Sequence, residues 1–106
     1  ATLSHPMKRI RVSAQAERDM DLIWVHIANE SGNMETPDRV IDAISDTFAL
    51  LAKMPEAGRR RNDIAPNVRS FPIGNYVIYY RIGNRHVIIS RVIHGMRDQR
   101  AAYMKG

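Results

Sequence analysis

The stretch "VRSFPIGNYVIYYRIGNRHVIISRVI", residues 68–93, decides the fold of this chain. The dipeptide Gly-Asn occurs twice in it, at 74–75 and 83–84, each time between runs rich in β-branched and aromatic residues. Glycine in the first place of a two-residue loop favours a type II′ turn, which joins antiparallel strands. The stretch therefore predicts a three-stranded antiparallel meander, with strands over about 68–73, 76–82 and 85–93.

Two-residue loops place Ile73 opposite Tyr76 and Ile82 opposite Arg85, and side chains alternate between the faces of a strand. The first face should pack on the rest of the fold, with Arg69 and Arg91 at its margins. It carries Phe71, Ile73, Tyr76, Ile78, Tyr80, Ile82, Val87, Ile89 and Ile93. The second face carries Pro72, Val77, Tyr79, Ile88 and Val92 among Ser70, Arg81, His86 and Ser90. It is apolar enough to need a cover, which the C-terminal tail, a second copy or a partner protein would supply.

The segment before the meander predicts a strand and two helices. Residues 8–12, "KRIRV", alternate as a short strand does. Ser13 is typical of a helix N-cap, and Gly32 is typical of a helix end. Thr36-Pro37 starts a second helix, which Pro55 stops. The apolar stripes are Ala16, Met20, Ile23, Trp24 and Ile27, then Val40, Ile41, Ile44, Phe48 and Leu51. The short link predicts an antiparallel helix hairpin, so the fold class is α+β: a short N-terminal strand, the helix hairpin and the meander, with Pro72 in an edge strand.

The composition is that of one globular domain. A chain of 106 residues can bury one modest core. It has no cysteine, and its four histidines lack metal-ligand spacing, so we expect neither a metal nor a cofactor. No apolar run reaches the ~18 residues of a membrane span. Residues 1–7 are expected to be an expression remnant or a disordered start, and residues 8–106 the domain.

The charge is +5 and rests mostly on arginine, 13 residues against 3 lysines. Arginine suits bidentate contact with carboxylates and phosphates. A solvated basic surface, an acidic protein partner and a nucleic acid are all compatible with this balance. The run Arg59-Arg60-Arg61 lies in the loop 55–67, and we interpret it as a solvated loop rather than a reader of DNA sequence.

Four blocks of the sequence resemble ParE-type toxins of the RelE/ParE superfamily. They are "AERDMDLIWVHIA" at 16–28, "FALLAKMPEAGR" at 48–59, "VRSFPIGNYVIYY" at 68–80 and "RVIHGMRD" at 91–98. The similarity runs through nearly the whole chain from Lys8. It implies the toxin of a bacterial type II toxin–antitoxin module, which acts in the cytoplasm, inhibits DNA gyrase and is neutralised by an acidic, ParD-like antitoxin. The candidates for antitoxin or target contacts are Arg59, Arg60, Arg61, Val77, Tyr79, Arg81, Ile88 and Arg97.

The same resemblance implies an alternative activity, because RelE-like members cut messenger RNA on the ribosome. Cutting at a 2′-hydroxyl needs a base, an acid and positive charge on the phosphate. Arg97 and Tyr103 match an arginine after the last strand and a late tyrosine of those enzymes, and His94 could transfer protons. Pro72 stands near the place of a strand arginine, and the lysines before it are missing. We therefore expect a toxin that is not an enzyme; a ribonuclease is the alternative, and a non-toxic scaffold is a third reading.

The polar residues near the last strand also have plain structural readings. In the counted register Arg69 and Arg91 lie four residues and two strands apart, too far to clamp one phosphate. Arg91 should pair with a carboxylate, for which Asp98 is a candidate. His94 should be a satisfied residue at the strand end, and Trp24 should belong to the core.

Overall fold

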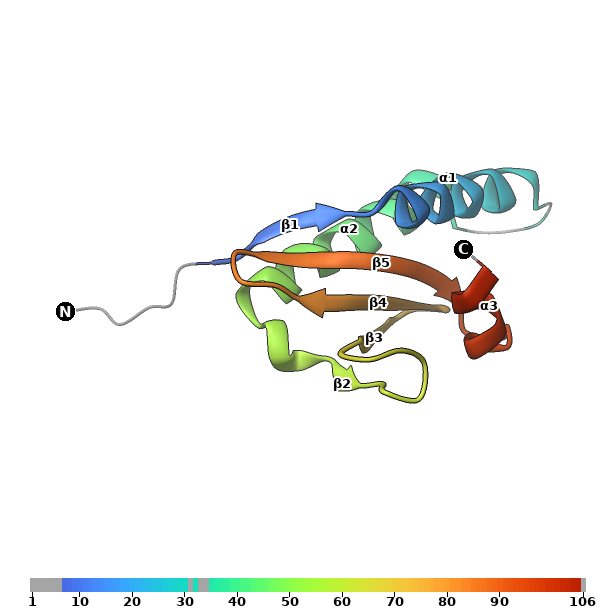
Figure 1. Cartoon of the computed structure of the whole chain (residues 1–106). Helices are drawn as coiled ribbons and strands as arrows, with labels where there is room; N and C mark the ends of the chain where they lie inside the picture. The colour runs from blue at the N-terminus through green and yellow to red at the C-terminus, as the bar shows by residue number, and fades with distance from the viewer. Residues whose placement is uncertain (1–6, 31, 33–34, 106) are drawn as a thin grey trace.

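The computed structural model describes residues 7–30, 32 and 35–105, and it has the α+β architecture expected from the sequence. The elements are β1 (Arg9–Val12), α1 (Ala14–Asn29), α2 (Pro37–Lys53), the 3-10 turn η1 (Pro55–Ala57), β2 (Arg59–Arg60), β3 (Arg69–Ile73), β4 (Tyr76–Ile82), β5 (His86–His94) and α3 (Gln99–Lys105). The α1–α2 hairpin lies along one side of the sheet, and α3 lies at the far end of β5 (Figure 1). The expectation for the start of the chain covers residues 1–7, of which residues 1–6 lie outside the described residues.

The predicted helix boundaries follow from their capping residues. The Ser13 hydroxyl accepts from the Ala16 amide at the start of α1, and the Thr36 hydroxyl accepts from the Arg39 amide at the start of α2. Each bond satisfies one of the amide groups that a first turn leaves free. Pro55 prevents α2 from continuing, and the helix ends at Lys53.

The strand order across the sheet is β1-β5-β4-β3-β2. The first strand of the sequence thus runs parallel beside the last, with Ile10 opposite Val87. The short β2 was not predicted; it pairs with β3 only at Arg69 and Ser70. Pro72 lies beyond this pairing, where the outer side of β3 has no neighbour in the described part of the chain. This position suits proline, which has no backbone N–H to donate to a neighbouring strand.

The register of the meander agrees with prediction in the first hairpin and not in the second. Ile73 lies opposite Tyr76, and Gly74 takes a φ of 56°, which a glycine adopts without strain. In the second hairpin Ile82 lies opposite Val87, not Arg85. The amide of Gly83 donates to the carbonyl of His86, so the loop consists of Asn84 and Arg85.

A β-bulge in β5 produces the second departure from the predicted register. Tyr79 lies opposite Arg91 and Tyr80 opposite Ile89, which leaves Ser90 as the additional residue. The residues beyond the bulge therefore exchange faces. Val92, predicted on the second face, packs in the core beneath the helices, and Ile93, predicted on the first, packs on the other side.

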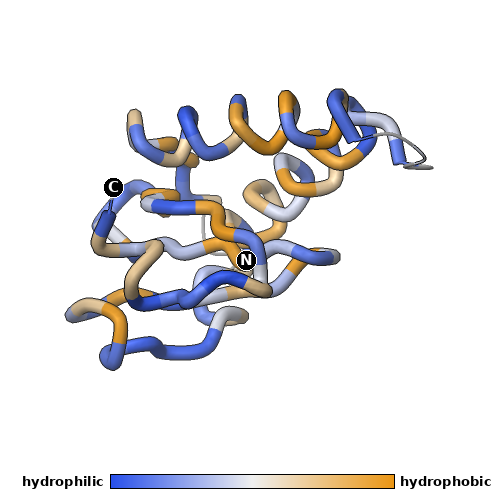
Figure 2. The backbone as a smooth tube through the Cα atoms, turned by 90° about the vertical axis from the view of Figure 1, so that its right-hand side faces the viewer, coloured by the Kyte–Doolittle hydropathy of each residue, from blue (hydrophilic) through white to orange (hydrophobic). Residues whose placement is uncertain are grey.

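The main core lies between the helix hairpin and the first face of the sheet. Both predicted helix stripes contribute to it, and the hydropathy along the uppermost helix alternates from turn to turn (Figure 2). Trp24 is the exception, because its side chain is 43% exposed and its ring nitrogen donates to Asp38 on α2 at 2.9 Å. The prediction that Trp24 is a core residue was therefore wrong; the ring lies on the outside of the hairpin.

A second, smaller core covers part of the second face. Ile64, Val68, Tyr79, Ile93 and Ala102 are buried together there. The segment after β2 and the helix α3 cover this part of the face. Of the three covers left open by the sequence, the C-terminal tail, a second copy and a partner protein, the structure thus contains the C-terminal tail. The helix itself was not predicted. Asp98 caps it by accepting from the amide of Ala101.

Gly58 packs against Tyr80 of the main core and the backbone of β3, and replacing it should destabilise the fold. Its amide donates to the hydroxyl of Tyr80, and a Cβ at this position would lie 2.8 Å from the carbonyl oxygen of Ser70 and against the Tyr80 hydroxyl. Because the backbone of β3 cannot move freely, we expect Gly58→Ala to cost about 1–3 kcal/mol in the free energy of unfolding. Gly95→Ala is the matched control, since its Cβ would have ordinary contact at 3.4 Å. Chemical denaturation of both variants measures the difference, and equal midpoints would contradict the packing described.

Candidate functional site

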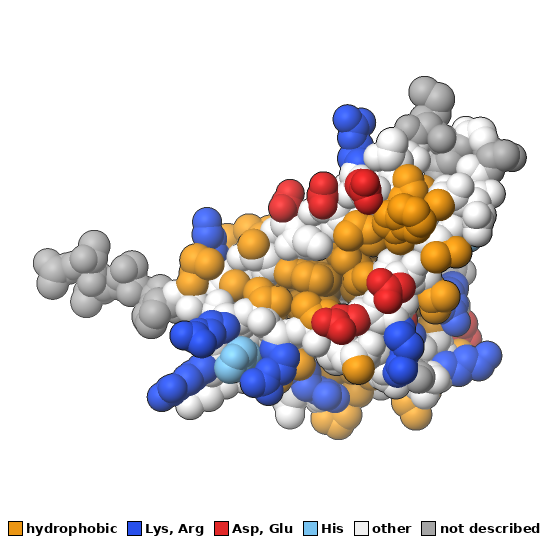
Figure 3. All heavy atoms as spheres, turned by 90° about the horizontal axis from the view of Figure 1, so that it is seen from above, with side chains coloured by type: hydrophobic (Ala, Val, Ile, Leu, Met, Phe, Trp, Pro, Cys, Tyr) orange, Lys and Arg blue, Asp and Glu red, His pale blue; other side chains and the backbone are white. Residues whose placement is uncertain are grey.

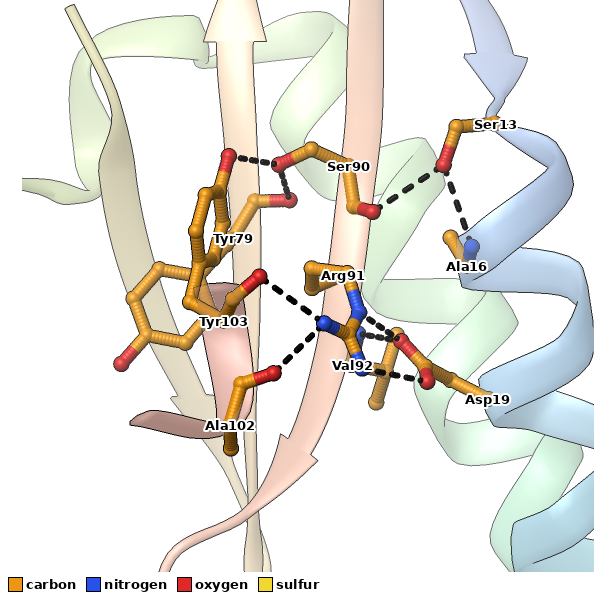
Figure 4. Close-up of polar contacts among 9 residues, drawn as sticks. All are labelled: Ser13, Ala16, Asp19, Tyr79, Ser90, Arg91, Val92, Ala102 and Tyr103. Carbon is orange, nitrogen blue, oxygen red and sulfur yellow. Dashed lines mark hydrogen bonds and ion pairs between the residues drawn. The ribbon is translucent and has the colours of Figure 1, made fainter. Parts of the chain in front are cut away.

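Arg91, the first residue of the last sequence block that resembles the toxins, is the most buried charged residue of the described chain. It is 7% exposed. Its guanidinium donates to both carboxylate oxygens of Asp19 on α1, at 2.8 and 3.0 Å (Figure 4). A third nitrogen donates to the carbonyls of Ala102 and Tyr103 in α3. The hydrogen bonds that Arg91 donates to Asp19 raise the pKa of Arg91 above its ordinary value, so the side chain is a permanent buried cation.

This arrangement corrects one sequence prediction and extends it. Arg91 does pair with a carboxylate, but the partner is Asp19 and not Asp98. Asp19 also accepts from the backbone amide of Val92, which follows the bulge in β5. The last carbonyls of a helix have no partners within the helix, and Arg91 satisfies two of them in α3. One side chain therefore joins α1, β5 and α3.

His94 closes the strand β5 and is satisfied locally, as predicted. Its Nδ1 accepts from the amide of Met96 at 3.1 Å, and its ring packs edge-on against Tyr76 with centroids 5.2 Å apart. Burial raises the pKa of Tyr76, which keeps the phenol protonated. Gly95 follows in a turn, and its amide donates to the carbonyl of Asn75.

The three residues of the ribonuclease alternative do not converge. The hydroxyl of Tyr103 donates to Ser90 at 3.1 Å, four residues before His94 on the same strand. At ~3.3 Å per residue this puts the phenol oxygen about 13 Å from the histidine along β5. Arg97 is exposed, and the contacts found for it are made by its backbone. A base, an acid and a phosphate clamp within reach of one nucleotide are not assembled from these three.

Arg69 and Arg91, which the sequence placed together on the first face, are also committed to internal contacts, and the bulge moves Arg91 to the position opposite Tyr79 of the second face. The bulge and the shifted hairpin put Arg91 two residues beyond the position facing Arg69, not the four that were counted. They remain two strands apart. Arg69 donates to the carbonyl of Gly58 at 2.8 Å, and Arg91 is bound by Asp19.

The remaining candidates fall into two groups. Arg59, Arg60, Arg81 and Arg97 are exposed. Arg61 is already paired, since its guanidinium donates twice to Asp63, which raises the pKa of Arg61.

Of the apolar candidates, Val77 and Ile88 are partly buried. The expectation that Tyr79 contacts a partner needs correction, because its ring is 0% exposed and its hydroxyl donates to Gln99 of α3.

Sequence reasoning missed an exposed apolar band on the helix hairpin. A continuous hydrophobic band crosses the face in Figure 3 and is bordered by Asp and Glu side chains. The large exposed hydrophobic side chains of the two helices are Leu22, Trp24, Val25 and Leu50. The available signal was that Leu22, Val25 and Leu50 are apolar but lie outside the predicted core stripes, whereas Trp24 had been assigned to a stripe. Among the described residues no helix is long and apolar enough to cross a membrane, and no three metal-ligating side chains lie together.

Comparison with known proteins decides the family. The pattern of the ParE toxin of the type II toxin–antitoxin system, parDE, matches residues 10–99. The chain belongs to the ParE toxin family. Its four resembling blocks, and the fold that they imply, are thereby confirmed as those of the RelE/ParE superfamily.

Individual relatives agree with this assignment. Toxin ParE1 of Caulobacter vibrioides is 30% identical over 95 residues, which span 90% of this chain and 97% of the relative. Toxin RelE3 of the same organism is 30% identical, over 85% of this chain and 97% of the relative.

Two solved structures have the same fold. The chromosomal ParDE toxin–antitoxin system from P. aeruginosa superposes with a TM-score of 0.70 at 19% identity, over 83% of this chain and 96% of that chain. The toxin–antitoxin complex RelBE2 from Mycobacterium tuberculosis superposes with a TM-score of 0.58 at 26% identity, over 83% and 98%. The family membership is therefore supported by both sequence and structure, while relatives bear both the ParE and the RelE names.

Proposed function

We propose that this ParE family member inhibits DNA gyrase by binding it in the bacterial cytoplasm, and that it does not cut RNA. The observation that carries the proposal is that the polar side chains along β5 are held in hydrogen bonds within the protein. Arg91 is bound by Asp19, Tyr103 by Ser90 and His94 by the amide of Met96. Groups held in internal contacts and about 13 Å apart along the strand are poor candidates for joint proton transfer and phosphate stabilisation.

We also propose that an acidic antitoxin neutralises the toxin. Both solved structures with this fold come from toxin–antitoxin systems, which supports a partner of this kind. The exposed apolar band of the hairpin offers area for an antitoxin segment, and the outer sides of β2 and β3 offer a sheet edge to which a strand can be added. Arg59, Arg60 and Arg81 are exposed cations that acidic side chains of the antitoxin can meet.

The association of toxin and antitoxin should depend on salt. Exposed charges act mainly on encounter, so we expect the association rate to fall roughly tenfold from low to high salt, with little change in dissociation. Replacing Arg59 and Arg60 by alanine should remove much of this dependence. Arg61→Ala is the control, because Asp63 already neutralises that arginine. Stopped-flow kinetics over a salt series measures both rates, and an association rate insensitive to salt would contradict the electrostatic part of the proposal.

A ribosome-dependent ribonuclease is the second candidate function. It is favoured by the similarity to Toxin RelE3, at 30% identity, and by the RelBE2 complex, at 26%. A scaffold that binds an antitoxin without toxicity is a third. Gyrase supercoiling and mRNA cleavage, assayed with the same preparation, separate all three, since the scaffold would be silent in both assays.

A further inference from the structure

A set of exposed arginines lies on the second face of the sheet, at the end away from α3. Ile10 and Val12 of β1 pack into the main core, so the alternating residues Arg9 and Arg11 project from the opposite face. Arg11 lies beside Ile88 of β5, and Ile88 lies beside Arg81 of β4. At ~4.8 Å per strand, Arg11 and Arg81 are about 10 Å apart and flank one isoleucine.

This surface, which we call the β1–β4 arginine face, consists of Arg9, Arg11 and Arg81 around His86 and Ile88, with Arg85 in the loop that adjoins it. His86 lies beside Arg9 in the sheet. All four arginines are exposed. Figure 3 shows Lys and Arg side chains gathered around a histidine at its lower left.

The charges of this face are not neutralised within the described part of the protein. The ion pairs found there are His26–Glu30, Arg61–Asp63 and Arg91–Asp19, and none involves an arginine of the face. Arg81 makes one long bond, of 3.4 Å, to the carbonyl of Pro66. Arg9, Arg11 and Arg81 are held close on neighbouring strands, with Arg85 in the adjoining loop. Like charges at this spacing repel one another, and an anion bound across them would relieve that repulsion.

A hollow of about 430 Å³ continues the face toward β2. Arg60, Asn62, Asn67, Arg69, Arg81 and Ile88 are among the residues that line it. It therefore combines guanidinium groups with amide side chains, which are the common donors to phosphate oxygens in protein–DNA contacts.

We propose that the β1–β4 arginine face binds the phosphodiester backbone of duplex DNA, without reading its sequence. Proteins that bind single strands add aromatic side chains on which bases stack. Among the described residues Trp24 is the one aromatic in the set of large exposed hydrophobic side chains, and it lies on the helix hairpin. The face thus offers charge and a flat sheet without a stacking platform, which fits a duplex backbone better than unpaired bases. An acidic protein segment is the competing occupant. This binding requires no gyrase and does not depend on the proposed inhibition.

The test measures binding of the full chain to a labelled duplex of arbitrary sequence. Fluorescence anisotropy gives the binding constant at each concentration of a salt series. Four phosphate contacts predict a slope of log Kobs against log[salt] of roughly −4. The double variant Arg9→Ala/Arg11→Ala should reduce the slope to roughly −2, and Arg85→Ala alone should reduce it by about one. The matched control is Arg18→Ala/Arg39→Ala, which removes the same charge from exposed positions on the helix hairpin and should leave the slope unchanged. Thermal melting checks that each variant is folded.

Competition identifies the occupant. Polyglutamate at an equal concentration of charge should displace the duplex poorly, and a single strand of the same sequence should bind more weakly than the duplex. The proposal is overturned if the duplex does not bind at low salt, if both double variants lower the slope equally, or if polyglutamate or the single strand binds better than the duplex.

Discussion

Asp19→Ala is expected to destabilise the protein by about 3–5 kcal/mol, because it leaves the guanidinium of Arg91 buried without its counter-charge. The same change removes the acceptor of the Val92 amide beside the β-bulge and so leaves a further polar group unpaired. The free energy of unfolding of a domain of this size is about 5–15 kcal/mol in total. The expected loss is therefore a large share of the stability of the protein. At ~4 °C per kcal/mol, the melting temperature should fall by about 12 °C or more.

Asp21→Ala is the matched control for this prediction. It removes one carboxylate from the same helix at an exposed position, where surface substitutions change stability by about 0.5 kcal/mol or less. The double variant Asp19→Leu/Arg91→Met should recover much of the loss, since apolar residues of similar volume often replace a buried pair without cost. Denaturant titration of the three variants and the wild type decides the matter. If Asp19→Ala were as stable as Asp21→Ala, the Asp19–Arg91 pair would not be the link between α1, β5 and α3 described above.

Arg97→Glu is expected to weaken gyrase inhibition by about tenfold or more, and Arg97→Ala by clearly less. Arg97 is exposed after the end of β5, so in a docking surface it acts through charge alone. Alanine removes an attraction, while glutamate adds a repulsion, and a tenfold loss corresponds to about 1.4 kcal/mol. Inhibition curves for gyrase supercoiling measure the ranking.

His94→Ala separates docking from catalysis in the same assay. Under the proposed function it should leave inhibition nearly intact, because the imidazole is used within the fold. A nuclease would be recognised in an RNA cleavage assay instead. There, Arg97→Ala would remove a charge that stabilises the transition state and would lower cleavage by about 10²–10³-fold while the protein stayed folded. Equal inhibition by the alanine and glutamate variants of Arg97 would remove it from the docking surface.

Much of the fold could be predicted because its signals are local. Ser13, Thr36 and Pro55 act within one helical turn of the boundaries they set. Gly74 supplies the positive φ of its own hairpin, so the register from Ile73 to Tyr76 follows directly. The second Gly-Asn pair misled because Gly83 closes the loop instead of forming it, which moved the register by two residues on β5.

The functional surface was harder to predict because its determinants are distant in the sequence. The bulge at Ser90 reverses the faces of Val92 and Ile93, and nothing in the local pattern of β5 marks it. Asp19 meets Arg91 across 72 positions of the chain. Tyr79 was assigned to the correct face, but the cover supplied by α3 made it an interior residue. Trp24 fitted the helical stripe and yet lies outside, where Asp38 accepts its N–H.

The central claim is that the toxin inhibits gyrase without cutting RNA, and one paired measurement with wild-type protein tests it most directly. The same preparation is added to a gyrase supercoiling reaction and to ribosomes programmed with a defined mRNA. The account predicts concentration-dependent loss of supercoiling, relieved by the cognate antitoxin, and an intact message. Site-specific cleavage of the message on the ribosome, abolished by Arg97→Ala and accompanied by unaffected supercoiling, would contradict it.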